Sequence, residues 1–361
     1  MPSTMGEKTF LDFYKNTILG YSKNLQKYIC TLLEQEGRIT FEEQRNLFDS
    51  NEKVYFESKK DFKKIIIETA TDIKFSNFYE KWEFIKLYKY SVPFFYKMPE
   101  GKDFQKLIEE KKITLFKDKE FKASYVISSS FKDATPLCMI KEEKIFLKFV
   151  LQKSFLTPNS YDRIDYRYPL VIYFDLKNSC LEVRYDSTKY SASFNNEVYE
   201  DIVNDCIEWL TRELGLILFD CDHNNIIDVV NDKQNESVKM YKQMMELSSG
   251  GAAELTASES ADYVLPFIGE IRELIDENEE LFSEAEDVKQ LLLQYLEDKE
   301  ATARYPYIYI KWVDPVESQS YIVKVTFDYF NHKHTLLQHI TGSCKDLGME
   351  RMNNAIEYLC Q

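Results

Sequence analysis

The sequence predicts an α+β protein, because helical and strand-like spacings of apolar residues occupy different parts of the chain. Helical spacing dominates the first 120 residues and returns between residues 197 and 300. Period-two alternation, which is typical of half-buried strands, governs residues 121–190 and three segments near the C-terminus. With 361 residues, of which 44% are apolar, the chain is long enough for about two ordinary cores.

Residues 1–120 are predicted to form a helical domain rich in lysine and aromatic residues. An apolar-periodic run over residues 9–36 ends at Gly37, a typical helix stop. A capping-box pattern at Thr40 predicts that a second helix begins there. Ser58 and Ser76 are expected to cap two further helices.

Residues 121–244 are predicted to form an α+β domain. Two apolar runs flank the turn sequence LKNS, which predicts a hairpin over residues 168–185. Helical spacing over residues 197–214, followed by Gly215, predicts an amphipathic helix that a glycine terminates. The small, polar segment 245–261 comes next and is predicted to be a linker or mobile loop.

Residues 262–361 are predicted to combine an acidic helix pair with a β-meander and a final helix. Apolar residues recur at helical spacing through 262–282 and 284–300, so these segments are expected to be stable amphipathic helices and not a disordered acidic tail. Three strands and the last helix are expected at residues 305–313, 320–330, 334–340 and 349–360.

Charge is strongly segregated along the chain. Residues 1–153 carry 28 Lys+Arg against 23 Asp+Glu, whereas residues 197–300 carry 7 against 27. The formal net charge of the whole chain is -15. A mildly basic front and a strongly acidic back are more typical of an interaction protein than of a small-molecule enzyme.

The sharpest local pattern lies in LLEQEGRITFEEQRNLF, which reads as a helix, a glycine, a short extended stretch and a capped helix. Many winged helix-turn-helix domains begin in this way, so the N-terminal domain is predicted to be winged-helix-like. A helix over residues 59–72 would then present cations to phosphates. The candidate nucleic-acid-binding residues are Lys59, Lys60, Lys63 and Lys64. The alternative is an ordinary helical bundle with a solvated lysine face.

The segment DCDHNNIIDVVN matches a calcium-binding loop at several positions. Asn225 stands where such loops have a turn glycine, and Asn231 stands where they have the closing glutamate. The alternative is a polar turn between two buried segments. The candidate metal ligands are Asp220, Asp222, Asn224 and Asp228.

Other residues that suit metal chemistry form weaker patterns. Three of the four histidines cluster and could hold zinc or lie at the surface of a strand turn: His332, His334 and His339. A metal-dependent nuclease needs an Asp followed by Glu-x-Lys on a neighbouring strand. Two triplets fit loosely: Asp133 with Glu142 and Lys144, and Asp175 with Glu182 and Arg184.

The remaining sequence features narrow the class of protein. Neither a Walker-type phosphate loop nor a G-x-G-x-x-G turn occurs, which counts against nucleotide chemistry, and no cofactor is indicated. Seven cysteines without any C-x-x-C spacing favour reduced thiols. Without a signal sequence or a long apolar run, the protein is expected to be cytoplasmic and away from membranes.

Together these patterns predict a non-catalytic binding or assembly subunit of a bacterial multi-protein complex that acts on or near DNA, of the kind found in phage defence. DNA contact is expected through residues 1–120, and docking of a protein partner or of a second copy is expected through residues 262–300. Two alternatives stay open: a divalent-metal-dependent nuclease, and a protein-only interaction or sensor module.

Overall fold

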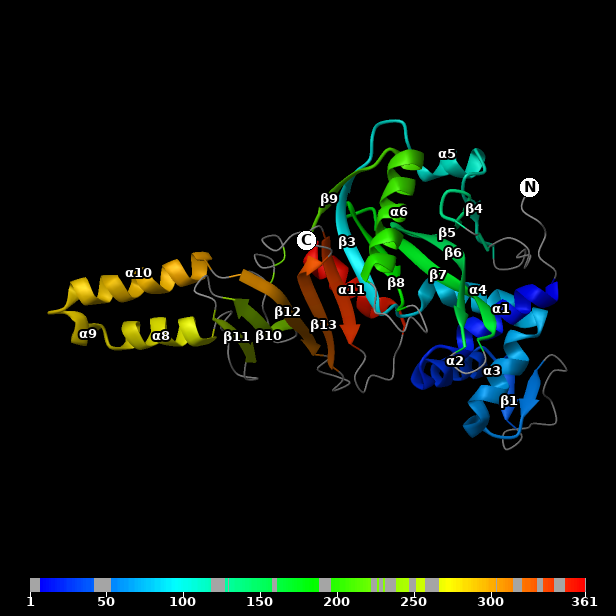
Figure 1. Cartoon of the computed structure of the whole chain (residues 1–361), viewed down its shortest axis with the longest axis horizontal. Helices are drawn as coiled ribbons and strands as arrows, with labels where there is room; N and C mark the ends of the chain where they lie inside the picture. The colour runs from blue at the N-terminus through cyan, green and yellow to red at the C-terminus, as the bar shows by residue number, and fades with distance from the viewer. Residues whose placement is uncertain are drawn as a thin grey trace. The chain divides into compact units, whose positions relative to one another are not determined.

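The computed structural model describes most of the chain. The described residues are 7–41, 53–117, 127–128, 130–157, 161–187, 196–221, 226, 230, 238–246, 251–256, 266–302, 304–313, 320–329, 334–340 and 348–360. Helices and strands are both abundant, which confirms the predicted α+β class. Figure 1 shows these elements, coloured from blue at the N-terminus to red at the C-terminus.

The chain divides into two compact units, each built from more than one stretch of sequence. The first comprises Met1–Lys89, Phe95–Phe219 and Lys345–Asn353. The second comprises Tyr90–Phe94, Asp220–Cys344 and Asn354–Gln361. Both units therefore contain sequence from each of the predicted segments 1–120, 121–244 and 262–361.

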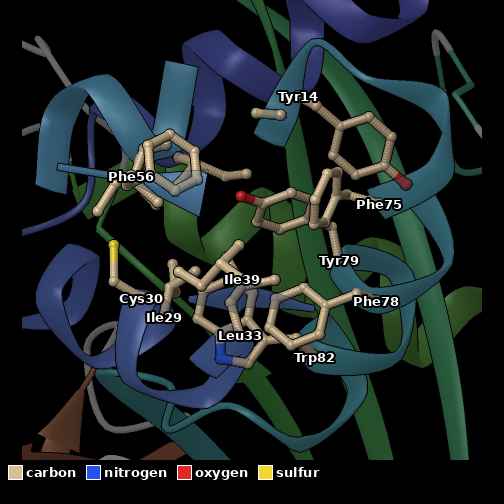
Figure 2. Packing of buried hydrophobic residues seen from close by; sticks show 14 of the residues in the cluster. Tyr14, Ile29, Cys30, Leu33, Ile39, Phe56, Phe75, Phe78, Tyr79 and Trp82 are labelled. Atoms are coloured by element: carbon tan, nitrogen blue, oxygen red, sulfur yellow. The ribbon is translucent and has the colours of Figure 1, made fainter. Parts of the chain in front are cut away.

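The first unit begins with a small helical layer. Its elements are α1 (Glu7–Leu19), α2 (Lys23–Gln35), β1 (Ile39–Phe41), β2 (Val54–Phe56), the short 3-10 helix η2 (Lys59–Asp61), α3 (Phe62–Ala70), η3 (Ile73–Phe75) and α4 (Ser76–Ile85). Aromatic and aliphatic side chains from most of these elements point at one another in a single core (Figure 2). Tyr79 and Trp82 of α4 and Leu33 of α2 are almost fully buried there. Short elements hold together because they share this core.

The sheet of the first unit follows this layer. Its strands lie in the order β8 (Cys180–Tyr185), β7 (Arg163–Asp175), β6 (Lys144–Leu156), β5 (Leu137–Lys141) and β4 (Thr114–Leu115). The helices α5 (Phe104–Glu109) and α6 (Asn196–Leu214) complete the unit. β7 and β8 form the predicted antiparallel hairpin, in which Asp175 pairs with Cys180. Gly215 ends α6 with a φ of 67°, a left-handed conformation that favours glycine.

Successive residues of β6 point to opposite faces of this sheet. On one face, the ring of Phe149 packs edge-on against Trp209 of α6 at a centroid distance of 5.1 Å. On the other face, Lys148 reaches the carboxylate of Glu80 on α4. The sheet is therefore covered on both faces, which explains why the middle of β6 is buried throughout.

The second unit holds the acidic helices and the other strands. Its sheet has the order β11 (Ala252–Thr256), β10 (Val238–Glu246), β12 (Arg304–Val313), β13 (Ser320–Tyr329), β14 (His334–Ile340) and the start of β3 (Tyr90–Lys97). Its helices are α8 (Pro266–Glu277), α9 (Glu279–Phe282), α10 (Glu286–Thr302) and the later part of α11 (Glu350–Leu359), which begins in the first unit. β9 (Ile217–Asp220) and its pairing partner β3 each have residues in both units. The predicted acidic helices, three strands and final helix are thus present within a few residues of their expected limits.

Several local predictions differ from the structure. The run 9–36 is two helices, because Ser22 begins α2 by accepting a hydrogen bond from the backbone N–H of Leu25. Thr40 lies in β1, and the helix that its capping box predicts falls outside the described residues, which end at Phe41 and resume at residue 53. The apolar stretch after α4 is the strand β3, although residues 1–120 were predicted to be helical.

The segment 245–261, predicted to be a linker or mobile loop, contains the end of β10 and all of β11. These strands pair antiparallel, with Gln243 opposite Leu255. Backbone pairing therefore orders part of a segment whose composition is typical of a loop.

Among the described residues, no helix has both the length and the apolar character that a bilayer crossing requires.

Candidate nucleic-acid interface

The candidate interface lies where the N-terminal turns of α2 and α3 come together. α2 turns Ile29, Cys30 and Leu33 inward, and α3 turns Ile65 and Ile66 inward. Because each helix buries one face, its lysines are left on the solvent side. The Cys30 thiol also donates a weak hydrogen bond to the carbonyl oxygen of Phe62, at 3.9 Å. α2 and α3 are thereby fixed beside each other.

Lysines from both helices and from η2 line a single hollow of about 740 Å³. The lining residues are Lys23, Lys27, Lys60, Asp61, Phe62, Lys63 and Lys64. Five cations thus face one acidic side chain, which makes the hollow strongly positive. Because α2 and α3 both begin at the hollow, the positive ends of two helix dipoles add to this potential.

Three of the four predicted lysines line the hollow, and the fourth does not. Lys60, Lys63 and Lys64 are exposed and, within the described part of the chain, form no salt bridge. Lys59 lies outside the hollow, where its ammonium contacts the carboxylate of Glu34 at 2.5 Å and sits over the ring of Phe41. Three lysines therefore keep their charge available for an anion.

Sequence reasoning missed the contribution of α2. Lys23 and Lys27 stand four residues apart, so they share one face of a helix, and that spacing is visible in the sequence. The packing of α2 against α3 places Lys23 and Lys27 beside the lysines of η2 and α3, and no local sequence pattern predicts that packing. Lys27 also lies over the ring of Phe62, with the nitrogen 5.6 Å from the ring centroid.

The predicted winged-helix arrangement is not established by these elements. β1 and β2 pair in parallel, with Ile39 opposite Val54. Residues 42–52, which join them, lie outside the described residues. The lysine hollow does not depend on that arrangement, because α2, η2 and α3 alone supply its lining.

A second group of charged residues lies in the interior of the first unit. Glu80 and Glu83 of α4 contact Lys148 of β6 and Arg167 of β7, and we call these four residues the buried quartet. The Arg167 guanidinium lies 2.6 Å from Glu80 and 2.9 Å from Glu83. No side chain of the buried quartet is more than 2% exposed. Because these four side chains are buried and paired with one another, we interpret the quartet as structural.

Burial shifts the protonation of charged groups in and beside the buried quartet. It raises the pKa of Glu83, and Arg167 and Lys148 oppose this shift. Burial also lowers the pKa of Lys86, which is paired with Asp186 and lies 3.6 Å above the ring of Tyr88. Perturbed groups of this kind often mark active sites, but here each charged group has an internal partner.

The predicted calcium loop can be assessed at one position only. Asp220 ends β9, is exposed, and lies 3.0 Å from the Nδ1 atom of His334. Asp222, Asn224 and Asp228 lie outside the described residues. Of the histidine cluster, His332 also lies outside them, and His339 is buried with Nε2 3.3 Å from the hydroxyl of Ser91. In the part of the chain that is described, no three potential metal ligands gather.

Members of the two nuclease triplets make local contacts in the described structure. Asp175 accepts hydrogen bonds from the backbone N–H groups of Lys177 and Asn178, which form the turn between β7 and β8. Glu182 is buried and contacts Arg184 at 2.7 Å. In the other triplet, Asp133 accepts a hydrogen bond from the hydroxyl of Ser130, and Glu142 occupies a surface turn with a φ of 57°.

The lysine hollow is therefore the best-defined candidate site. A comparison of the sequence with protein-family models and with curated proteins finds no match.

Proposed function

We propose that this chain is a non-catalytic binding subunit that contacts the phosphate backbone of DNA through the lysine hollow. One observation carries the proposal: lysines from α2, η2 and α3 line one hollow, and three of them form no salt bridge with any described residue. Phosphate groups are the anions that such a cluster suits best, because each lysine ammonium can contact a phosphate and release a bound counterion.

The net charge of the chain supports a local contact and argues against a diffuse one. At a formal net charge of -15, the molecule as a whole repels DNA. Residues 1–153, which contain the hollow, carry 28 basic against 23 acidic residues. Binding through this region would position the protein on the backbone without reading the base sequence, because phosphate contacts carry no sequence information. Such a role suits a subunit of a larger assembly on DNA, and phage defence is one setting for it.

The proposal is tested with the full chain and a labelled DNA duplex. Replacing Lys60, Lys63 and Lys64 together by glutamine should weaken DNA binding about tenfold or more, because three phosphate contacts are lost. Fluorescence anisotropy at low salt measures this change. The matched control replaces the exposed lysines Lys132, Lys141 and Lys177 by glutamine, which removes the same charge elsewhere in the first unit.

The two variants separate a local site from a general charge effect. If both lose affinity equally, only net charge matters and the hollow is not a DNA site. If neither the protein nor its variants bind duplex or single-stranded DNA, the proposal is wrong. Tighter binding to an RNA duplex than to DNA would move the function to RNA, since the 2′-hydroxyl is what distinguishes the two.

A further inference from the structure

The helix α10 carries two apolar stripes, and the described part of the chain covers only one of them. Leu293 and Leu296 pack against α8 and α9, where Ile271, Ile275 and Phe282 complete a small core. A second stripe faces solvent. Its members are Val288 (50% exposed), Leu291 (67%), Leu292 (38%) and Tyr295 (57%).

The spacing of the outer stripe is that of a helix that packs against another helix. Val288, Leu291, Leu292 and Tyr295 stand at positions i, i+3, i+4 and i+7, so with about 3.6 residues per turn they share one face over two turns. α10 uses the same kind of spacing on its inner side to pack against α8. Apolar residues scattered singly on a surface need no partner, but a continuous stripe of four marks an interaction site.

The surroundings of the outer stripe are strongly acidic. Residues 271–299 contain ten Asp+Glu and three Lys+Arg, a net charge of -7, and all ten acidic side chains are exposed. Lys289 contacts Glu279 at 2.9 Å and Lys299 lies over the ring of Tyr295, so the carboxylates of this segment outnumber the cations that could neutralise them. A partner helix therefore meets apolar side chains at the centre and uncompensated carboxylates at the rim.

We propose that the outer stripe of α10 docks a basic amphipathic helix of a partner protein. The apolar side chains of that helix would pack against Leu291 and Tyr295, in the way an amphipathic helix occupies an apolar surface. Its Lys and Arg residues would lie against the acidic rim, where complementary charge fixes orientation and speeds association. A second copy of this chain fits poorly, because two helical segments of net charge -7 would then face each other.

The experiment uses the full chain and a synthetic peptide of about 18 residues, with leucines on one helical face and lysines on the other. Isothermal titration calorimetry should show binding to the unchanged protein. The double variant Leu291→Gln, Tyr295→Gln should bind the peptide about tenfold more weakly or worse, because two apolar contacts at the centre are lost. The matched control, Gln290→Ala with Gln294→Ala, changes two exposed polar residues of the same helix and should bind as the unchanged protein does.

Three outcomes would overturn the proposal. A scrambled peptide of the same composition that binds equally well would show attraction by charge alone. Sedimentation equilibrium that shows a dimer abolished by the Leu291 and Tyr295 changes would assign the stripe to a second copy of the chain. If the peptide did not bind at concentrations up to about 1 mM, the outer stripe would not be a docking site for a basic amphipathic helix. Because the changed residues are exposed, circular dichroism should show that both variants stay folded.

Discussion

The buried quartet and the lysine hollow use positive charge in opposite ways. In the quartet, Lys148 and Arg167 each contact both Glu80 and Glu83, and none of the four side chains is more than 2% exposed. In the hollow, Lys60, Lys63 and Lys64 are exposed and form no salt bridge among the described residues. The contrast shows that the number of lysines alone says little about function. A lysine can bind an external anion only if its ammonium is not already in a salt bridge with a carboxylate of the protein.

The largest expected effect comes from breaking the buried quartet. Arg167→Met should lower the free energy of unfolding by about 3–5 kcal/mol, because it leaves Glu80 and Glu83 with one buried cation between them. Urea denaturation measures this loss. Arg163→Met is the control, since Arg163 lies on the same strand with a side chain that is 66% exposed. Equal stability of the two variants would mean that the quartet is not structural.

A second prediction concerns the pH dependence of stability. The pKa of Glu83 is raised above its ordinary value of 4.5, so the folded state holds this proton to higher pH than the unfolded state does. The stability that Glu83 contributes is therefore complete below pH 4.5 and is lost as pH rises through the folded pKa. The free energy of unfolding should then decrease with pH in this window, by at most about 1.4 kcal/mol per pH unit.

Glu83→Gln removes this titration and should flatten the decrease. Urea denaturation at a series of pH values from about 4 to 8 compares the two proteins. Glu68→Gln, at an exposed position of α3, is the control and should leave the slope unchanged. If the Glu83→Gln protein kept the same slope, the proton would be held elsewhere.

The smallest expected effect tests the availability of Lys59. Glu34 holds its ammonium at 2.5 Å, so Glu34→Gln should release one further cation beside the hollow. DNA binding should become about two- to fivefold tighter, in line with the modest energy of one surface ion pair. Glu143→Gln removes the same charge from an exposed turn of the first unit and should change the affinity less. Equal gains in the two variants would mean that the Glu34 contact does not restrain Lys59.

Local patterns predicted those parts of the fold that local chemistry decides. The turn between β7 and β8 and the end of α6 at Gly215 were correctly predicted, because a turn sequence and a glycine specify them within a few residues. β3 was missed, because its apolar residues follow an aromatic helix directly and its pairing partners lie far away in the sequence. β11 was missed because backbone pairing with β10 outweighs its loop-like composition.

The same limit applies to the sites. The sequence could place Lys60, Lys63 and Lys64 near one another because they stand within a few residues of each other. Lys23 and Lys27 could not be joined to them, since the packing of α2 on α3 decides that contact. The buried quartet was invisible for the same reason. Its partners on α4 and on the sheet are separated by 65 residues or more.

The measurement that tests the lysine hollow most directly is the salt dependence of DNA binding. For the full chain, the logarithm of the binding constant should fall linearly with the logarithm of salt concentration between about 50 and 200 mM. Replacing Lys60, Lys63 and Lys64 by glutamine should reduce the slope by about 3, since each lost phosphate contact removes about one released counterion. An unchanged slope in that variant would show that these lysines contact no phosphate and would contradict the proposed function.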